Sequence, residues 1–129
     1  YKFSVAEQKG ISAVCTLTAE ISESFEHDVS LILSNLLDNA IEASEQLKNI
    51  KPEIILKITE KSGYYSIMIK NRISNSILYN NQQLCTTKAD KKHHGYGLKT
   101  VRLLAEAHNG MMDIYEKDGF FIVNIMLNN

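Results

Sequence analysis

The sequence predicts an α+β domain in which helices cover one face of a mixed β-sheet. Strand-like and helix-like stretches alternate along the chain, two pairs of strands are separated by two-residue turns, and the longest helix has one apolar face. Two-residue turns join antiparallel strands, whereas strands connected through a helix can run parallel. The sheet is therefore expected to contain both kinds of pairing.

Each predicted element has its own local signature. Apolar residues alternate along the strands and recur every three or four positions along the helices. Pro52 is expected to end the long helix by residues 48–50, because the residue before a proline avoids helical geometry. In chain order the prediction is a helix up to residue 9 ended by Gly10, a strand at 11–18, a helix at 28–48, strands at 53–60 and 64–70 joined by Ser62-Gly63, a helix at 98–108 ended by Asn109-Gly110, and strands at 111–116 and 120–127 joined by Asp118-Gly119.

Length and composition indicate one domain over residues 1–129. The 129 residues are 44% hydrophobic and 22% charged, and the formal net charge is -1. That charge, without a basic stripe, argues against nucleic-acid binding. No apolar run reaches the roughly 18 residues that a membrane span needs. Cys15 and Cys85 are isolated and are predicted to be buried thiols in a reducing compartment. The chain starts without Met and is expected to be a piece of a longer protein.

One face of the helix at 28–48 carries Asn35, Asp38, Asn39 and Glu42, with no Lys or Arg among them. Asn and Asp are poor residues for a solvated helix face, because their side chains compete for backbone hydrogen bonds. Their oxygens suit Mg²⁺, which takes one or two protein ligands and fills its shell with water and phosphate oxygens. The helix alone leaves open whether this stripe is solvated or binds a metal.

A second candidate site is the run His94-Gly95-Tyr96-Gly97-Leu98 at the start of the helix predicted at 98–108. Free N–H groups and the positive dipole of a helix start bind phosphate, and glycines allow it to approach closely. The run follows residues 71–94, which lack periodicity and are interpreted as a functional lid. Within them, Thr87 and Lys88 are candidate phosphate contacts, whereas Lys91 and Lys92 fit a solvated loop.

The two motifs NLLDNAIEAS and HHGYGLKTVRLLAEAHNG, in this order and with a hairpin between them, resemble the N box and second glycine box of the GHKL ATPase superfamily. The resemblance covers most of the chain and is strongest to the ATP-binding domain of sensor histidine kinases, in particular peptide-pheromone receptor kinases of the Agr and Com type. It implies a Bergerat-type two-layer α/β sandwich.

By position, the resemblance makes Asn39 the ligand of Mg²⁺ in a Mg-ATP complex, and Gly95, Gly97 and the Leu98 amide the phosphate cradle. Asn35 stands where gyrase-like ATPases carry the glutamate that activates water, and an amide cannot act as a general base. Asn71 stands where an aspartate usually contacts adenine, but the glycines that follow it in the family are missing. The residues predicted to bind ATP are Asn35, Asn39, Asn71, Thr87, Lys88, His94, Gly95, Tyr96, Gly97 and Leu98.

The resemblance further implies a protein-histidine kinase that passes the γ-phosphate of ATP to a histidine on a separate dimerisation domain of the same protein. A response regulator is the expected next partner, the full-length kinase is expected to be a homodimer, and the domain is expected on the cytoplasmic side of a membrane-anchored sensor. His27, His93, His94 and His108 show no phosphoacceptor or metal-ligand pattern and are interpreted as loop or surface residues. The alternatives are a degenerate interaction domain and an ATPase that couples hydrolysis to conformational change.

Overall fold

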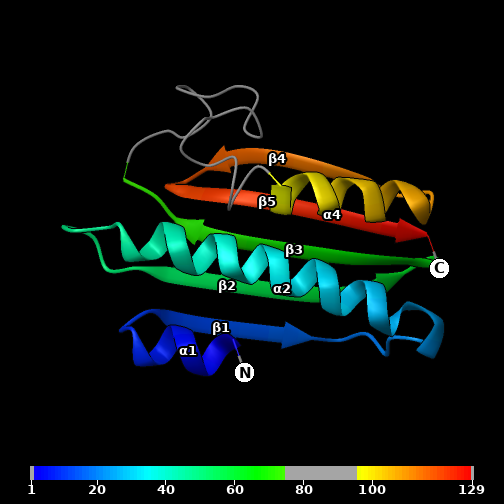
Figure 1. Cartoon of the computed structure of the whole chain (residues 1–129), viewed down its shortest axis with the longest axis horizontal. Coiled ribbons are helices and arrows are strands. Elements are labelled where there is room, and N and C mark those ends of the chain that lie inside the picture. The colour runs from blue at the N-terminus through cyan, green and yellow to red at the C-terminus, as the bar shows by residue number, and fades with distance from the viewer. Residues whose placement is uncertain (1, 75–95, 129) are drawn as a thin grey trace.

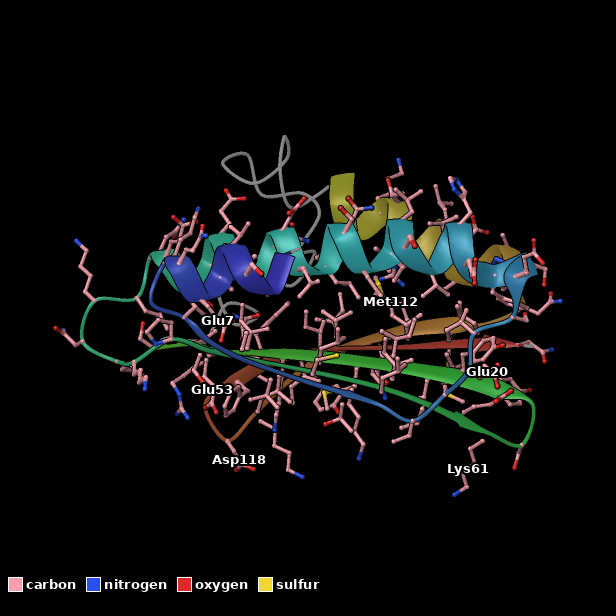
Figure 2. All side chains as sticks on the ribbon, turned by 90° about the horizontal axis from the view of Figure 1, so that it is seen from below. Glu7, Glu20, Glu53, Lys61, Met112 and Asp118 are labelled. Carbon is pink, nitrogen blue, oxygen red and sulfur yellow. The ribbon has the colours of Figure 1, made fainter. Side chains whose placement is uncertain are left out.

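The structure is a computed structural model that describes residues 2–74 and 96–128. A five-stranded sheet forms one layer and the helices lie together on one of its faces, as Figures 1 and 2 show. The predicted α+β class is confirmed. The elements are α1 (Lys2–Gln8), β1 (Ser12–Leu17), α2 (Glu23–Glu45), β2 (Glu53–Lys61), β3 (Tyr64–Arg72), α4 (Tyr96–Ala107), β4 (Met111–Lys117) and β5 (Phe120–Asn128).

The sheet has the strand order β1-β2-β3-β5-β4 and is mixed, as predicted. β1 and β2 pair in parallel, with Ala13 opposite Ile54, because helix α2 carries the chain back between them. The other three pairings are antiparallel. β3 lies at the centre of the sheet, and its last residues meet β2 on one side and β5 on the other.

Both hairpins turn through two residues with positive φ angles. Ser62 and Gly63 have φ of 53° and 83°, and Asp118 and Gly119 have φ of 54° and 81°. Two successive left-handed residues make the turn that matches the twist of antiparallel strands. The two predicted hairpins are therefore confirmed.

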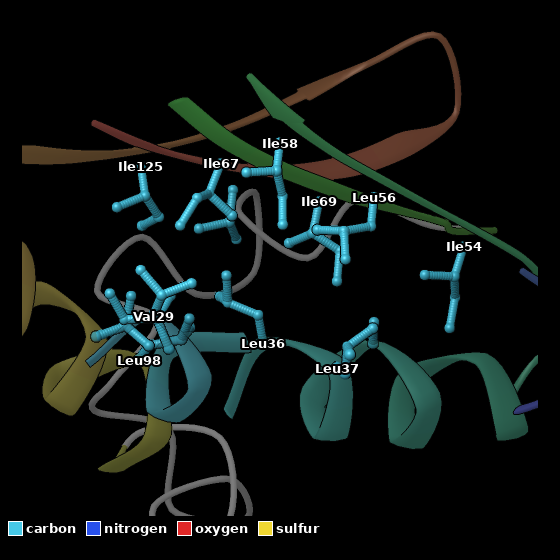
Figure 3. Packing of buried hydrophobic residues seen from close by; sticks show 14 of the residues in the cluster. Val29, Leu36, Leu37, Ile54, Leu56, Ile58, Ile67, Ile69, Leu98 and Ile125 are labelled. Atoms are coloured by element: carbon cyan, nitrogen blue, oxygen red, sulfur yellow. The ribbon is translucent and has the colours of Figure 1, made fainter. Parts of the chain in front are cut away.

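The core lies between the sheet and the helices (Figure 3). Alternate residues of β3 face the helix layer, and Tyr65, Ile67 and Ile69 are all buried there. Helix α2 supplies most of the opposite surface through the side chains of its apolar face. Its buried residues are Phe25, Val29, Ile32, Leu36, Leu37, Ala40, Ile41 and Ser44.

Helix α2 is displaced toward the N-terminus relative to the prediction. It begins at Glu23 rather than at residue 28, because Ser22 starts the helix and Phe25 is buried in the core. It ends at Glu45 rather than at residue 48, where the amide of Gln46 donates to the carbonyl of Ala43 in a tightened last turn. His27 consequently lies within the helix and is exposed.

The prediction that Cys15 is buried is wrong. Cys15 is exposed, although its partner Leu56 in β2 is buried. β1 is an edge strand, and α1 packs beside its first half (Figure 1), so the second half stays open and Leu17 is 59% exposed. Cys85 and most of the stretch interpreted as a lid lie outside the described residues. None of the described helices is both long and apolar enough to cross a membrane.

Candidate functional site

The polar stripe predicted on the central helix is present on α2, on the side away from its buried residues. Asp38 is exposed, and Asn35, Asn39 and Glu42 are half-buried. The Asn35 side chain is turned back along its own helix, where Nδ2 donates to the carbonyl of Leu31 at 3.1 Å. Its amide nitrogen is thus used within the helix, while its carbonyl oxygen takes no part in that bond.

Asn39 lies one turn further along α2. Its Nδ2 atom is buried and has no hydrogen-bond partner. A buried donor without a partner costs about 1–3 kcal/mol relative to one that is satisfied. Such an atom in the interior of a helix is expected where a bound group completes its hydrogen bonding. An asparagine side chain also offers one hard oxygen, which is suited to Mg²⁺, so its chemistry fits the predicted metal contact.

Asn71 occupies the end of the central strand β3, on the face turned toward the helices. It follows Tyr65, Ile67 and Ile69 in the buried alternation and is only 5% exposed. Its neighbours in the sheet are Ile54 and Phe121. The Nδ2 atom of Asn71 is buried without a partner, as in Asn39. The strand-end position predicted for Asn71 is confirmed, and its free donor fits a ligand edge that carries an acceptor.

Within the described part of the chain, few buried side-chain atoms lack a hydrogen-bond partner. They are Asn39 Nδ2, Ser44 Oγ, Asn71 Nδ2 and Asn124 Oδ1. Two of the four belong to residues that sequence reasoning had selected for ATP. Native structures leave few such atoms unpaired, and a bound ligand is one way to satisfy them.

The predicted glycine motif is only partly described. Tyr96 and Gly97 form the first turn of α4, so the helix begins two residues before the predicted start, and Leu98 is buried in the core. The predicted contacts Thr87, Lys88, His94 and Gly95 lie outside the described residues. The backbone N–H groups of this first turn have no acceptor within their own helix, which is the arrangement that binds phosphate.

The start of α4 lies level with the polar stripe of α2. The two helices run side by side in opposite directions (Figure 1), and His108 just beyond α4 contacts Asp28 near the start of α2. Ten residues back from His108 is Leu98, and ten residues on from Asp28 is Asp38. At about 1.5 Å per residue, both steps cover about 15 Å along nearly antiparallel axes. Asp38 and Leu98, 60 positions apart in sequence, therefore lie level with each other along the helix pair.

The pairing of His108 with Asp28 was missed by sequence reasoning, which interpreted His108 as a surface residue. His108 is half-buried, and its Nε2 donates to Oδ2 of Asp28 at 2.7 Å. The sequence signal was weak, because the two residues are 80 positions apart. Among the described residues, no group of three or more His, Cys, Asp or Glu side chains could hold a metal ion by itself. A magnesium ion here would rely on Asn39, water and phosphate oxygens.

Residues 26–128 match the family model described as the GHKL domain. No curated protein matches the sequence significantly. The fold is similar to that of the catalytic domain of the histidine kinase ThkA, with a TM-score of 0.76 at 15% identity over 98% of this chain and 87% of that chain.

Two larger kinases share the fold over about half of their length. The histidine kinase domain of a blue-light-activated kinase from Erythrobacter litoralis EL346 has a TM-score of 0.69 at 16% identity, over 98% of this chain and 55% of that one. The histidine kinase AdeS of Acinetobacter baumannii has a TM-score of 0.67 at 17% identity, over 98% and 58%. These likenesses establish a common fold, and the family match covers most of the sequence. The chain belongs to the GHKL domain family.

Proposed function

We propose that this domain binds Mg-ATP and is the catalytic domain of a sensor histidine kinase, donating the γ-phosphate to a histidine on a separate dimerisation domain. The observation that carries the proposal is the pair of buried, partnerless amides of Asn39 on α2 and Asn71 at the end of β3. The family and the fold of its structural neighbours support the same function.

Asn71 would recognise the adenine base. Its Oδ1 can accept a hydrogen bond from the 6-amino group, while its unpartnered Nδ2 donates to the adjacent ring nitrogen. This pairing uses both halves of the side chain and removes the cost of the buried donor. An aspartate at the same place could accept but could not donate.

Asn39 and the start of α4 would hold the triphosphate. Asn39 offers Oδ1 to Mg²⁺, and its buried Nδ2 is available to a phosphate oxygen. The N–H groups of the first turn of α4, together with Gly95, would bind the remaining phosphate oxygens. When bound, Mg²⁺ would supply charge neutralisation at the transferring phosphoryl group.

Asn35 supports transfer to a protein histidine rather than to water. Its Nδ2 donates to Leu31, and an uncharged amide cannot remove a proton from an attacking water. In this proposal the partner domain supplies the nucleophile, and this domain supplies position and charge. A response regulator as next acceptor, a homodimeric full-length kinase, a cytoplasmic location and the pheromone-receptor subclass are parts of the same proposal, carried by the resemblance of the motifs.

Calorimetric titration with Mg-ATP tests the proposal. The parent chain is expected to bind, while Asn39→Ala and Gly95→Val lose binding at millimolar nucleotide. Asn49→Ala is the matched control, because this exposed asparagine lies beyond the end of α2. Absence of heat with the parent chain would favour the degenerate interaction domain. Steady phosphate release by the chain alone, abolished in Asn39→Ala, would favour the hydrolytic alternative.

A further inference from the structure

The C-terminal end of α4 is fixed to the rest of the domain by several contacts. The helix ends at Ala107, Asn109 in the turn that follows has a φ of 54°, and the amide of Gly110 donates to the carbonyl of Ala105 at 2.8 Å. The carbonyl of His108 accepts from the amide of Asn128 in β5 at 3.1 Å. Gly110 lies so close to β5 that an added Cβ would be 1.7 Å from the carbonyl oxygen of Met126. This end of the helix therefore cannot slide along the sheet.

The side chain of His108 joins this fixed end to α2. Its Nε2 donates to Oδ2 of Asp28 at 2.7 Å, with the two side chains 20% and 31% exposed. This is a short hydrogen bond to a charged group, which is stronger than one between neutral groups. It is a direct polar contact between α2 and the α4 segment.

An aromatic cluster of Phe25 and Tyr65 packs against the His108 ring. The Phe25 ring lies 4.6 Å from the His108 ring and 5.1 Å from the Tyr65 ring, measured between centroids. Tyr65 is 1% exposed, and its hydroxyl accepts from the amide of Ser22 and donates to the carbonyl of Glu20. The cluster thus ties the start of α2 to the central strand β3. His108 is held against a surface that cannot easily move.

The opposite end of α4 is the proposed phosphate-binding end. It begins at Tyr96, about 18 Å from His108, and its first turn is level with Asp38 and Asn39 of α2. A helix is a stiff rod, so a shift where it is anchored moves its other end by a similar amount. The anchor near His108 therefore fixes the separation between the first turn of α4 and the side chain of Asn39.

We propose that His108 and Asp28 are positioning residues for Mg-ATP. Their contact sets the register of α4 against α2, so that the helix start and Asn39 contact one triphosphate and its metal simultaneously. The inference rests on the proposed function and adds two residues to it that do not touch the nucleotide. His108 and Asp28 are expected to affect the part of the nucleotide affinity that depends on Mg²⁺.

The test measures the dissociation constant of ATP with Mg²⁺ and again with EDTA, in the parent chain and in His108→Ala and Asp28→Ala. The ratio of the dissociation constant in EDTA to the dissociation constant with Mg²⁺ reports how well the metal contact and the phosphate contact act together. His108→Ala and Asp28→Ala are each expected to lower this ratio about fivefold, and the double variant to lower it no further, because the pair acts as a unit. Asn39→Ala, which removes the proposed metal contact itself, is expected to give no measurable binding in either condition.

Lys9→Ala is the matched control. It removes the 3.0 Å ion pair between Lys9 and Glu45, which joins α1 to the other end of α2, and it should leave the ratio unchanged. Each variant is measured well below its own unfolding midpoint, and Asp28→Asn replaces Asp28→Ala if the latter does not fold. A ratio equal to that of the parent in the variants of the pair, whatever their stability, would overturn the positioning role. Failure of the parent chain to bind Mg-ATP would instead refute the proposed function itself.

Discussion

The two ends of the α2–α4 helix pair differ in how their polar groups are satisfied. At the end near His108, the side chains of His108, Asp28 and Tyr65 all have hydrogen-bond partners. At the other end, Asn39 and Asn71 each bury a donor that has none. One end of the domain therefore contributes to stability, while the other retains unsatisfied groups whose cost the proposed ligand would recover.

The comparison makes opposite predictions for substitutions at the two ends. Removing a side chain near His108 should destabilise the fold. Removing the unpartnered donors should stabilise it and weaken binding, as is common where a site requires groups that the fold does not.

The largest effect is expected from Phe25→Ala. Phe25 is 9% exposed and lies between the rings of His108 and Tyr65, so its removal leaves a cavity beneath the histidine. The free energy of unfolding should fall by about 3–4 kcal/mol. Urea denaturation followed by circular dichroism measures it. A loss below about 1 kcal/mol would show that the aromatic cluster contributes little to the stability of the end near His108.

A smaller loss is expected from Gly110→Ala, since the new Cβ would overlap the carbonyl oxygen of Met126. The backbone of β5 must move to relieve this clash, at a cost of about 2 kcal/mol in the free energy of unfolding. Asn109→Gly is the control, because glycine adopts the left-handed conformation of Asn109 without strain. The same denaturation series compares the two. Equal stabilities would mean that α4 is not held tightly against the sheet.

The smallest change, and one of opposite sign, is expected from Asn71→Leu. An apolar side chain of similar size removes the buried donor at the end of β3, so the free energy of unfolding should rise by about 1 kcal/mol. The same variant should bind Mg-ATP more weakly. Thermal unfolding with and without nucleotide measures both the change in stability and the change in binding. A destabilised variant would show that Asn71 has a structural partner in the native protein.

The strands and their turns could be predicted because their signals are local. Ser62-Gly63 and Asp118-Gly119 adopt the left-handed pair of φ angles that such dipeptides favour, and the alternation in β3 correctly identified its buried face. The start of α2 could not be predicted from local pattern. Phe25 is the one apolar residue between positions 22 and 28, and it packs against Tyr65, forty positions later.

Alternation along β1 correctly placed Cys15 on the same face as the core, but it could not show that the described helices leave that part of the strand uncovered. A residue on an edge strand faces the interior only where a helix lies above it, and α1 is too short to cover all of β1.

At the site, the unfavourable residue types of the α2 stripe raised Asn39 as a candidate, and the resemblance of the motifs was needed to choose it and to add Asn71. Their missing partners became visible only in three dimensions. The pair of His108 and Asp28 could not be found from sequence, because 80 positions separate the two residues and nothing in the second motif links its His108 to Asp28.

The strand order also determines how the backbone of the domain should exchange its amide protons with solvent. β3 is paired along its length on both sides, whereas β1 pairs through six residues with a single neighbour. Opening of the sheet should therefore begin at β1 and reach β3 only in global unfolding. The asparagine proposed to recognise the base belongs to the most protected strand. Its orientation would persist through partial opening at the edges, so the domain could fluctuate at its periphery without losing its preference for one nucleobase.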